Sequence, residues 1–181
     1  MEQKLYNYEI ILNLLKSSNH LRQIAKDMDI NHMTIKRALG VLIKENVLDV
    51  KKQGKNNIYS IKKTLEAKNF ALMAEIYKLN NLIKAHPELK QSLKSLNNIP
   101  INLIVIFGSY AKGQETKNSD IDIYIETARS KIKKEASKIN SKFSVKIGEY
   151  NRENLLIKEI EKSHIIVKGV GIFYEKNKFF D

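Results

Sequence analysis

Four residues suited to phosphate chemistry lie between positions 108 and 122. The pair Gly108-Ser109 ends an apolar stretch, and ten residues separate it from Asp120, which is followed two positions later by Asp122. A glycine lets the backbone approach a phosphate closely, and carboxylates are ligands that Mg²⁺ prefers. A phosphate cradle beside a metal site is what transfer of a nucleotide from a nucleoside triphosphate requires.

The surrounding pattern predicts the elements that would position these residues. The apolar stretch 101–107 is typical of a buried strand, and 109–112 is expected to open a short helix whose free N–H groups face the same anion. Apolar residues alternate with polar ones over 120–126, which predicts a second strand with Asp120 and Asp122 on one face. The alternative is an ordinary strand–turn–helix–strand with solvated acids.

This motif resembles the signature of the DNA polymerase β-like nucleotidyltransferases, most closely the small minimal nucleotidyltransferases. The resemblance runs from Ile99 to the end of the chain, and Gly113 fits the family's second glycine. It implies a mixed sheet with helices, Mg²⁺, and ATP or another NTP as substrate. The nucleoside monophosphate would pass to a hydroxyl on protein, RNA or a small molecule. The residues implied are Asp120 and Asp122 for catalysis and metal, and Gly108, Ser109, Lys112 and Gly113 for the nucleotide.

One part of the family pattern is missing. Active members usually supply a third carboxylate from the neighbouring strand, here expected at 142–148, whose open face would carry Ser144 and Lys146. Glu126 lies about 13 Å along its strand from Asp122, and Glu149 lies just past the strand end. Either the strand register differs and Glu149 or another acid completes the site, or Lys146 places a positive charge there and catalysis is weak or absent. Lys146 would then hold a triphosphate as a point charge, or would simply be solvated.

The first 62 residues have a different pattern. Apolar residues at helical spacing predict three helices, near 5–15, 21–28 and 33–43, with Asn31 as N-cap of the third. Strands at 47–50 and 58–61 with a basic tip at 51–57 predict a hairpin. This arrangement resembles a winged helix-turn-helix, whose third helix would enter the major groove of DNA. The alternative is a protein-interaction or dimerisation module. The expected DNA contacts are His32, Thr34, Lys36 and Arg37 on the helix and Lys51, Lys52 and Lys55 on the wing.

The sequence therefore predicts an α+β chain in three parts: a winged helix-turn-helix at 1–62, a helical connector at 63–98 and a nucleotidyltransferase-like domain at 99–181. Thr64 is the expected N-cap of a helix that His86-Pro87 ends. Helices at 129–140 and 153–162 and short closing strands at 164–168 and 171–174 are expected to complete the last part. The apolar face of the connector must pack on that part or on a second copy, and we expect a homodimer.

Composition bounds the remaining possibilities. The net charge is +12 and there is no cysteine, so a basic surface that attracts nucleic acid or nucleotides is expected and thiolate metal sites are excluded. No leader-like start and no apolar run of about 18 residues is present, which predicts a cytoplasmic protein with no membrane partner. Two interpretations remain. The first is an enzyme. The second is a DNA-binding regulator or an antitoxin-like protein whose nucleotidyltransferase-like domain binds a nucleotide or a partner with little or no catalysis. A purely structural adaptor fits neither motif.

Overall fold

The computed structural model describes residues 2–181, with side chains from Leu5 onward. The chain forms two compact units, one of Met1–Tyr77 together with Phe180–Asp181 and one of Lys78–Phe179. The division falls inside helix α4 (Leu65–Ala85), which lies in the predicted connector. Whether 1–62, 63–98 and 99–181 behave as separate domains stays a prediction.

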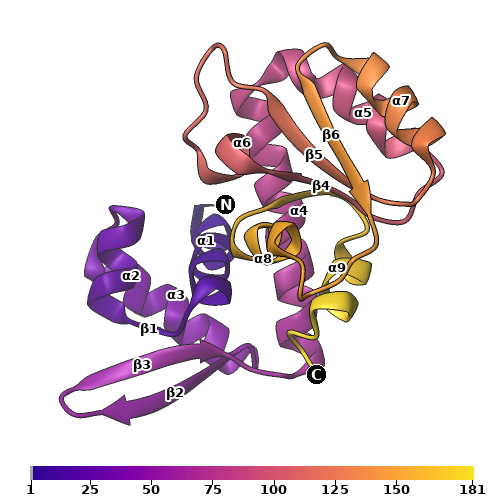
Figure 1. The fold of residues 1–181 in the computed structure, drawn as a ribbon. Coiled ribbons are helices and arrows are strands. Elements are labelled where there is room, and N and C mark those ends of the chain that lie inside the picture. Colours follow the sequence, from indigo (N-terminus) through magenta and orange to yellow (C-terminus); the bar gives the residue numbers. More distant parts are fainter. Residues whose placement is uncertain (1) are drawn as a thin grey trace. The chain divides into compact units, whose positions relative to one another are not determined.

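Three helices and a small antiparallel sheet make up the N-terminal unit before α4 (Figure 1). The sheet has the strand order β1-β3-β2. The helices are α1 (Glu2–Lys16), α2 (Leu21–Met28) and α3 (His32–Lys44), and the strands are β1 (Asn19–His20), β2 (Leu48–Gln53) and β3 (Asn56–Ile61). The three predicted helices are confirmed, whereas the short strand β1 was not predicted, because a two-residue strand leaves no alternation in the sequence.

Side-chain caps fix where helices α2 and α3 begin. The His20 side chain accepts a hydrogen bond from the Gln23 N–H, and Asn31 Oδ1 accepts one from the Met33 N–H at 2.8 Å. Each bond satisfies a backbone donor that has no partner within the helix. The predicted cap at Asn31 is confirmed. Ile24 on α2 and Ile35 on α3 are both fully buried, as their spacing predicts.

The hairpin strands reach further than the sequence pattern predicts. Residues 51–57 were expected to form a basic loop, yet Lys51 pairs with Ile58 and Lys52 with Asn57, and the turn is only Gly54-Lys55. That expectation is wrong because cross-strand backbone hydrogen bonds hold polar residues in a strand as well as apolar ones. Gly54 has a φ of +60°, which a glycine adopts readily at a tight turn.

A four-stranded mixed sheet forms the centre of the C-terminal unit (Figure 1). The strand order is β6-β5-β4-β7, with β5 parallel to β6 and β4 antiparallel to both β5 and β7. The mixed α+β class is therefore confirmed. The strands are β4 (Ile104–Phe107), β5 (Ile121–Glu126), β6 (Phe143–Gly148) and β7 (Ile165–Lys168), and the helices are η1 (Pro87–Leu89), α5 (Lys90–Asn98), α6 (Gly108–Lys112), α7 (Ser130–Ile139), α8 (Leu155–Lys162) and α9 (Val170–Asn177).

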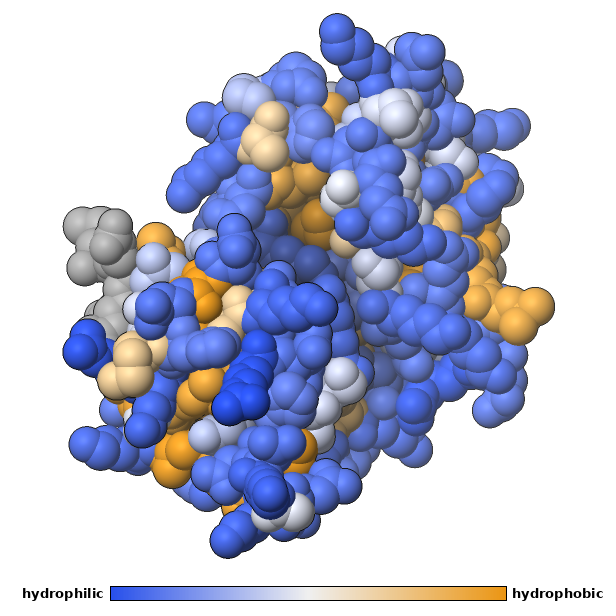
Figure 2. Space-filling view, turned by 90° about the vertical axis from the view of Figure 1, so that its left-hand side faces the viewer, coloured by the Kyte–Doolittle hydropathy of each residue, from blue (hydrophilic) through white to orange (hydrophobic). Residues whose placement is uncertain are grey.

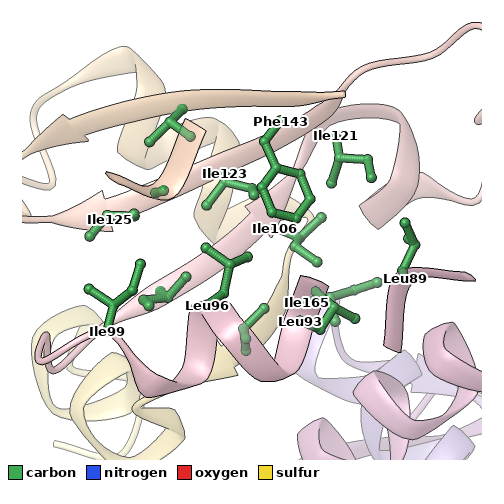
Figure 3. Close-up of a cluster of buried hydrophobic side chains, with 14 of the residues drawn as sticks. Leu89, Leu93, Leu96, Ile99, Ile106, Ile121, Ile123, Ile125, Phe143 and Ile165 are labelled. Atoms are coloured by element: carbon green, nitrogen blue, oxygen red, sulfur yellow. The ribbon is translucent and has the colours of Figure 1, made fainter. Parts of the chain in front are cut away.

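The two faces of this sheet have different coverings. Helices α5 and α7 cover one face, where Leu93 and Leu96 pack with the odd-numbered residues of β5 and β6 in one apolar cluster (Figure 3). Leu79, Leu82 and Ile83 from the end of α4 join that cluster, so this part of the connector packs on the C-terminal unit. Helices α8 and α9 lie on the other side of the sheet (Figure 1). The even-numbered residues of β5 and β6 face that other side.

The end of the chain differs from the prediction. Residues 171–174 were expected as a strand but belong to helix α9, which buries Phe173 and Tyr174. A short apolar run fits a helix as well as a strand. Gly169 decides between them: it has a φ of +86°, and a Cβ there would overlap the Asn102 carbonyl oxygen. The chain turns sharply at this glycine, and the Phe173 N–H then donates to the Gly169 carbonyl at 2.9 Å.

Two surface observations bear on partners. Within residues 2–181, none of the helices has the length and apolar character needed to span a membrane. Hydrophilic residues cover most of the face drawn in Figure 2, and hydrophobic residues form smaller patches among them.

Candidate functional site: a glycine turn against a carboxylate strand

Gly108 stands at the junction of strand β4 and helix α6. All four residues of β4 are buried, and the helix begins directly after Phe107. The strand is shorter than the predicted 101–107, because Ile101 turns back and its N–H donates to the Ile99 carbonyl at 2.8 Å. Gly108 has a φ of +70°, a conformation that glycine adopts without steric cost. Gly113, with a φ of +66°, ends α6 in the same conformation.

The side chain of Asp122 lies directly against Gly108. Strand β5 pairs Asp122 with Phe107, the residue before the glycine. A Cβ on Gly108 would overlap Asp122 Oδ2 and would lie 3.2 Å from Cγ. The absence of a side chain at position 108 is therefore what lets the carboxylate reach the turn between β4 and α6.

The two aspartates lie at the same end of β5. Ile121 and Ile123 are fully buried in the core cluster, so Asp122 between them is directed to the opposite face, and Asp120 immediately precedes the strand. Asp120 is exposed and Asp122 is half-buried. The register confirms the predicted direction of Asp122, and the pairing of the two carboxylates on one face stays a prediction.

Ser144 occupies the position beside Asp122 on the neighbouring strand. The parallel pairing of β5 with β6 places Asp122 opposite Ser144 and Tyr124 opposite Lys146. Phe143 and Val145 are buried in the core cluster, so Ser144 and Lys146 face the other side, as predicted. Lys146 is exposed and Ser144 is half-buried.

The register excludes Glu149 from the site. Gly148 pairs with Glu126 at the far end of β5, so Glu149 lies roughly 16 Å along the strand from Ser144. Glu126 forms an ion pair with Lys176, 2.7 Å between Oε1 and Nζ. The interpretation in which a shifted register brings Glu149 to the metal is wrong. Within the described part of the chain, no group of three or more His, Cys, Asp or Glu side chains could hold a metal ion.

Lys112 already has an acidic partner. Its Nζ lies 3.0 Å from Glu159 Oε1 on helix α8, and both side chains are partly exposed. Any contact between Lys112 and a phosphate would compete with this ion pair. The nucleotide-binding roles of Ser109, Lys112, Gly113 and Lys146 stay predictions.

Three side-chain contacts hold the loop between α6 and β5. His86 Nε2 lies 2.9 Å from Glu115 Oε1, and Lys142 Nζ donates to the Lys117 carbonyl at 2.8 Å. Thr116 N–H donates to Ser119 Oγ at 2.9 Å. These contacts fix the segment that leads into Asp120. The first two contacts join residues far apart in sequence, so no local pattern could have revealed them.

The hydroxyl of Tyr110 on helix α6 is sheltered near this loop. Its ring centroid lies 5.3 Å from that of His86. Burial raises the pKa of Tyr110 above its ordinary value, and the nearby charges of Glu115 and Glu88 act in the same direction. Tyr110 therefore keeps its proton and serves in packing.

A second candidate surface lies in the N-terminal unit. A depression of about 290 Å³ opens between the start of α2, helix α3 and the hairpin. We call it the basic depression, because Arg22, Lys36 and Lys55 line it and no Asp or Glu does. It is also lined by His20, Leu21, Asn56, Asn57 and Tyr59.

The structure brings only some of the predicted DNA contacts to the basic depression. Lys36 and Lys55 line it, and Lys52 shares a hairpin face with its partner Asn57. Lys51 points to the opposite face, because adjacent strand residues alternate. The remaining predicted contacts lie outside it; His32 and Arg37 are exposed and Thr34 is half-buried. Arg22 was not predicted, since a lone arginine at a helix start has no distinguishing pattern.

Comparison with known proteins gives one match. The family model described as Nucleotidyltransferase domain matches residues 86–176, just over half of the chain. The match covers Gly108, Asp120 and Asp122 as well as the whole four-stranded sheet. No curated protein and no solved structure gives a significant match.

Proposed function

Because the chain belongs to the nucleotidyltransferase domain family, we propose that its C-terminal unit transfers a nucleoside monophosphate from a nucleoside triphosphate to an acceptor. The observation that carries the proposal is the close packing of Gly108 against Asp122. It puts a turn with no side chain, which a triphosphate can approach, beside a carboxylate. The acceptor oxygen would bond to the α-phosphorus while the bond to the bridging oxygen breaks and pyrophosphate leaves.

The two aspartates fit a magnesium ion. Mg²⁺ is usually held by one or two carboxylates together with substrate phosphates and water, and Asp120 and Asp122 supply that number from one strand end. When bound, such an ion would offset the charge on the phosphates and on the departing pyrophosphate. Asp120 is exposed and Asp122 is half-buried.

The other residues of the site would bind and orient the nucleotide. Gly108 would let the backbone approach the triphosphate, and the Ser109 hydroxyl would donate to a phosphate oxygen. Lys112 on α6 would contribute a positive charge, in competition with its ion pair to Glu159. Gly113 follows the fifth and last residue of α6 and ends the helix, so the loop that leads to Asp120 begins there.

Labels on different phosphates of the substrate test this function. The protein would be incubated with Mg²⁺, an extract of its source, and each nucleoside triphosphate labelled on either the α- or the γ-phosphate. Nucleotidyl transfer places the α-label in a product and leaves the γ-label in pyrophosphate. Transfer of the γ-label alone would make the protein a phosphoryl transferase and would contradict the proposal.

A second candidate function is nucleotide binding without turnover. It is favoured by the pairing of Ser144, rather than an acid, with Asp122. The protein would then be a regulator, or an antitoxin-like protein, that responds to a bound nucleotide. Binding of a nucleoside triphosphate in equilibrium dialysis, with no α-label transferred under any condition, would select this function.

We further propose that the N-terminal unit is a winged helix that binds DNA. The proposal is supported by helix α3 following the Asn31 cap, by the hairpin beside it, and by the three cations of the basic depression. Cations at this position would contact phosphates, which sets affinity and register rather than sequence choice. A homodimer would let two copies of α3 read two half-sites.

Binding to a DNA fragment from upstream of its own gene tests this second role. Fluorescence anisotropy at two salt concentrations would show affinity that falls as salt rises, because released counterions drive the association. Light scattering of the complex would give the number of chains per site. Binding that does not change with salt would contradict a phosphate-contacting surface.

A further inference from the structure

We infer that the acceptor of the transferred nucleotide is a phosphate monoester, an oxygen that is already ionised, rather than a hydroxyl. The inference rests on the proposed nucleotidyl transfer and names its second substrate. It replaces the hydroxyl acceptor expected from the sequence. The reasons are the absence of a proton acceptor beside the two aspartates and the presence of two cations along the strand next to them.

The side chains beside the aspartates cannot take a proton from a hydroxyl. Ser144, opposite Asp122, is neutral, and Lys146 two residues further is a hydrogen-bond donor only. Glu126 is paired with Lys176, and Glu115 lies 2.9 Å from His86. Asp120 and Asp122 are themselves committed to the metal in the proposed function. A hydroxyl acceptor, which keeps its proton near neutral pH, therefore has no uncommitted base among the described residues of β5 and β6, and the carboxylate of Glu159 on α8 is held by Lys112.

One face of the edge strand β6 carries positive charge on both sides of Ser144. Lys142 immediately precedes the strand, two residues before Ser144, and Lys146 follows Ser144 by two residues. Residues two apart along a strand share a face, and their Cα atoms are about 7 Å apart. Both lysines are exposed. Lys142 also donates to the Lys117 carbonyl, which keeps its ammonium group near the loop into Asp120. An anionic acceptor would gain from both charges, whereas a neutral one would not.

A phosphate monoester fits this arrangement on both counts. Near pH 7 it carries a charge of about −1.5 to −2 and has strong acceptor oxygens. One of those oxygens would bond to the α-phosphorus, and the bond from that phosphorus to the bridging oxygen would break. Pyrophosphate would leave with the electron pair. The product is a phosphoanhydride, and no proton has to be removed from the attacking oxygen.

Phosphatase treatment of the acceptor pool tests the inference. An extract would be divided into a small-molecule fraction and a nucleic-acid fraction, and half of each would be treated with a phosphatase that is then removed. We expect wild-type protein to transfer the α-label only in an untreated half. The fraction that is labelled tells a small phosphate ester from a terminal phosphate of nucleic acid. A phosphoanhydride hydrolase should release the label.

Two outcomes of this experiment are negative and can be told apart. Equal labelling of treated and untreated halves would mean a hydroxyl acceptor, and would overturn this inference while leaving the proposed function standing. No labelling in any half would overturn the proposed transfer and this inference with it. Labelled product that resists the phosphoanhydride hydrolase would also count against a phosphate acceptor.

Phosphate binding gives a readout that does not depend on turnover. Inorganic phosphate would be titrated against sodium chloride of equal ionic strength while backbone amide NMR signals are followed. We expect phosphate alone to shift the Ser144 and Lys146 signals, and Lys146→Ala to weaken that binding about tenfold, as loss of one charge-assisted bond predicts. Lys138→Ala on helix α7 is the matched control. Equal shifts with both salts, or equal weakening by both variants, would overturn the inference.

Discussion

The carboxylate of Asp122 occupies the space where Gly108 would carry a side chain. The strand pairing of Phe107 with Asp122 brings the two residues together, and a Cβ on Gly108 would overlap Oδ2. Gly108 is thus required twice, once for its φ of +70° and once for the room it leaves. The contact couples the shape of the turn that we propose binds phosphate to the position of the acid that we propose binds metal.

Replacing Gly108 by alanine should therefore damage both stability and transfer. Gly113 has nearly the same φ, +66°, but nothing lies within 4 Å of a Cβ there. Gly113→Ala should lower the free energy of unfolding by about 1–2 kcal/mol through backbone strain alone. Gly108→Ala should lower the free energy of unfolding by more than Gly113→Ala does, because Asp122 must also move. It should also reduce α-label transfer to at most about a tenth of that of Gly113→Ala. Urea unfolding and transfer assays of the two variants would show the difference, and equal effects would contradict the contact.

The sequence revealed this contact only in outline. Local patterns correctly placed Gly108 at a strand end, Asp122 on the face away from the core cluster, and Ser144 and Lys146 on the same side of the next strand. The pairing register, which rules out Glu149, depends on how distant strands align and cannot be read from alternation. The contact between His86 and Glu115 and the depression that includes Arg22 likewise arise only from tertiary packing.

The errors at the ends of elements have a common physical cause. The short apolar run at 171–174 is compatible with either a helix or a strand. The turn at Gly169 that selects the helix depends on the Asn102 carbonyl. Residues 51–57 are polar, yet the strand opposite supplies their hydrogen bonds. In both places a distant segment of the chain decides the local structure.

Tyr124 should make the protein sensitive to alkaline pH. It is buried, its hydroxyl donates to the Gly148 carbonyl at 3.0 Å, and burial raises its pKa well above the ordinary value of about 10, with Glu126 and Glu149 adding to the effect. Because the pKa of this tyrosine is higher in the folded state than in the unfolded state, its contribution to stability is fully present below pH 10. That contribution is lost as the pH rises through the pKa of the folded state.

Tyr124→Phe tests this directly. Because the variant lacks this hydrogen bond, its free energy of unfolding at pH 7 should be about 1 kcal/mol lower than that of wild type. Its stability should fall less steeply in the alkaline range than that of wild type. Tyr150, whose pKa is also raised by burial and by the hydrogen bond to Glu161, retains its own contribution. Urea unfolding across the alkaline range is the measurement, and parallel curves for the two proteins would exclude Tyr124 as a cause.

Freeing Lys112 should strengthen nucleotide binding. Glu159→Gln removes its ionic partner on α8 while keeping the shape of the side chain. Exposed ion pairs contribute little to stability, so the free energy of unfolding should change by less than about 1 kcal/mol. The dissociation constant for ATP, measured by equilibrium dialysis, should fall in Glu159→Gln and rise in Lys112→Ala. An unchanged constant in both variants would remove Lys112 from the nucleotide site.

The basic depression should account for part of any DNA affinity. Arg22→Ala and Lys36→Ala each remove a cation that lines it. Each should reduce the slope of log affinity against log salt concentration by roughly the amount expected for one phosphate contact. Lys44→Ala is the control, because Lys44 lies at the end of the same helix α3 and outside the depression. Anisotropy titrations at several salt concentrations give the slopes. A slope that falls equally in Lys44→Ala would indicate general charge rather than a defined surface.

The most direct test of the nucleotidyltransferase site compares two acids of strand β5, Asp122 and Glu126, with Asp120, which immediately precedes the strand. Asp120→Asn and Asp122→Asn change the two carboxylates near Gly108, and Glu126→Gln changes the acid at the far end of β5 that pairs with Lys176. Wild type and Glu126→Gln should transfer the α-label from a nucleoside triphosphate in the presence of Mg²⁺. Both aspartate variants should lose transfer by at least about a hundredfold, as expected when metal-held charge stabilisation is removed. Undiminished transfer by Asp122→Asn would contradict the assignment of this site.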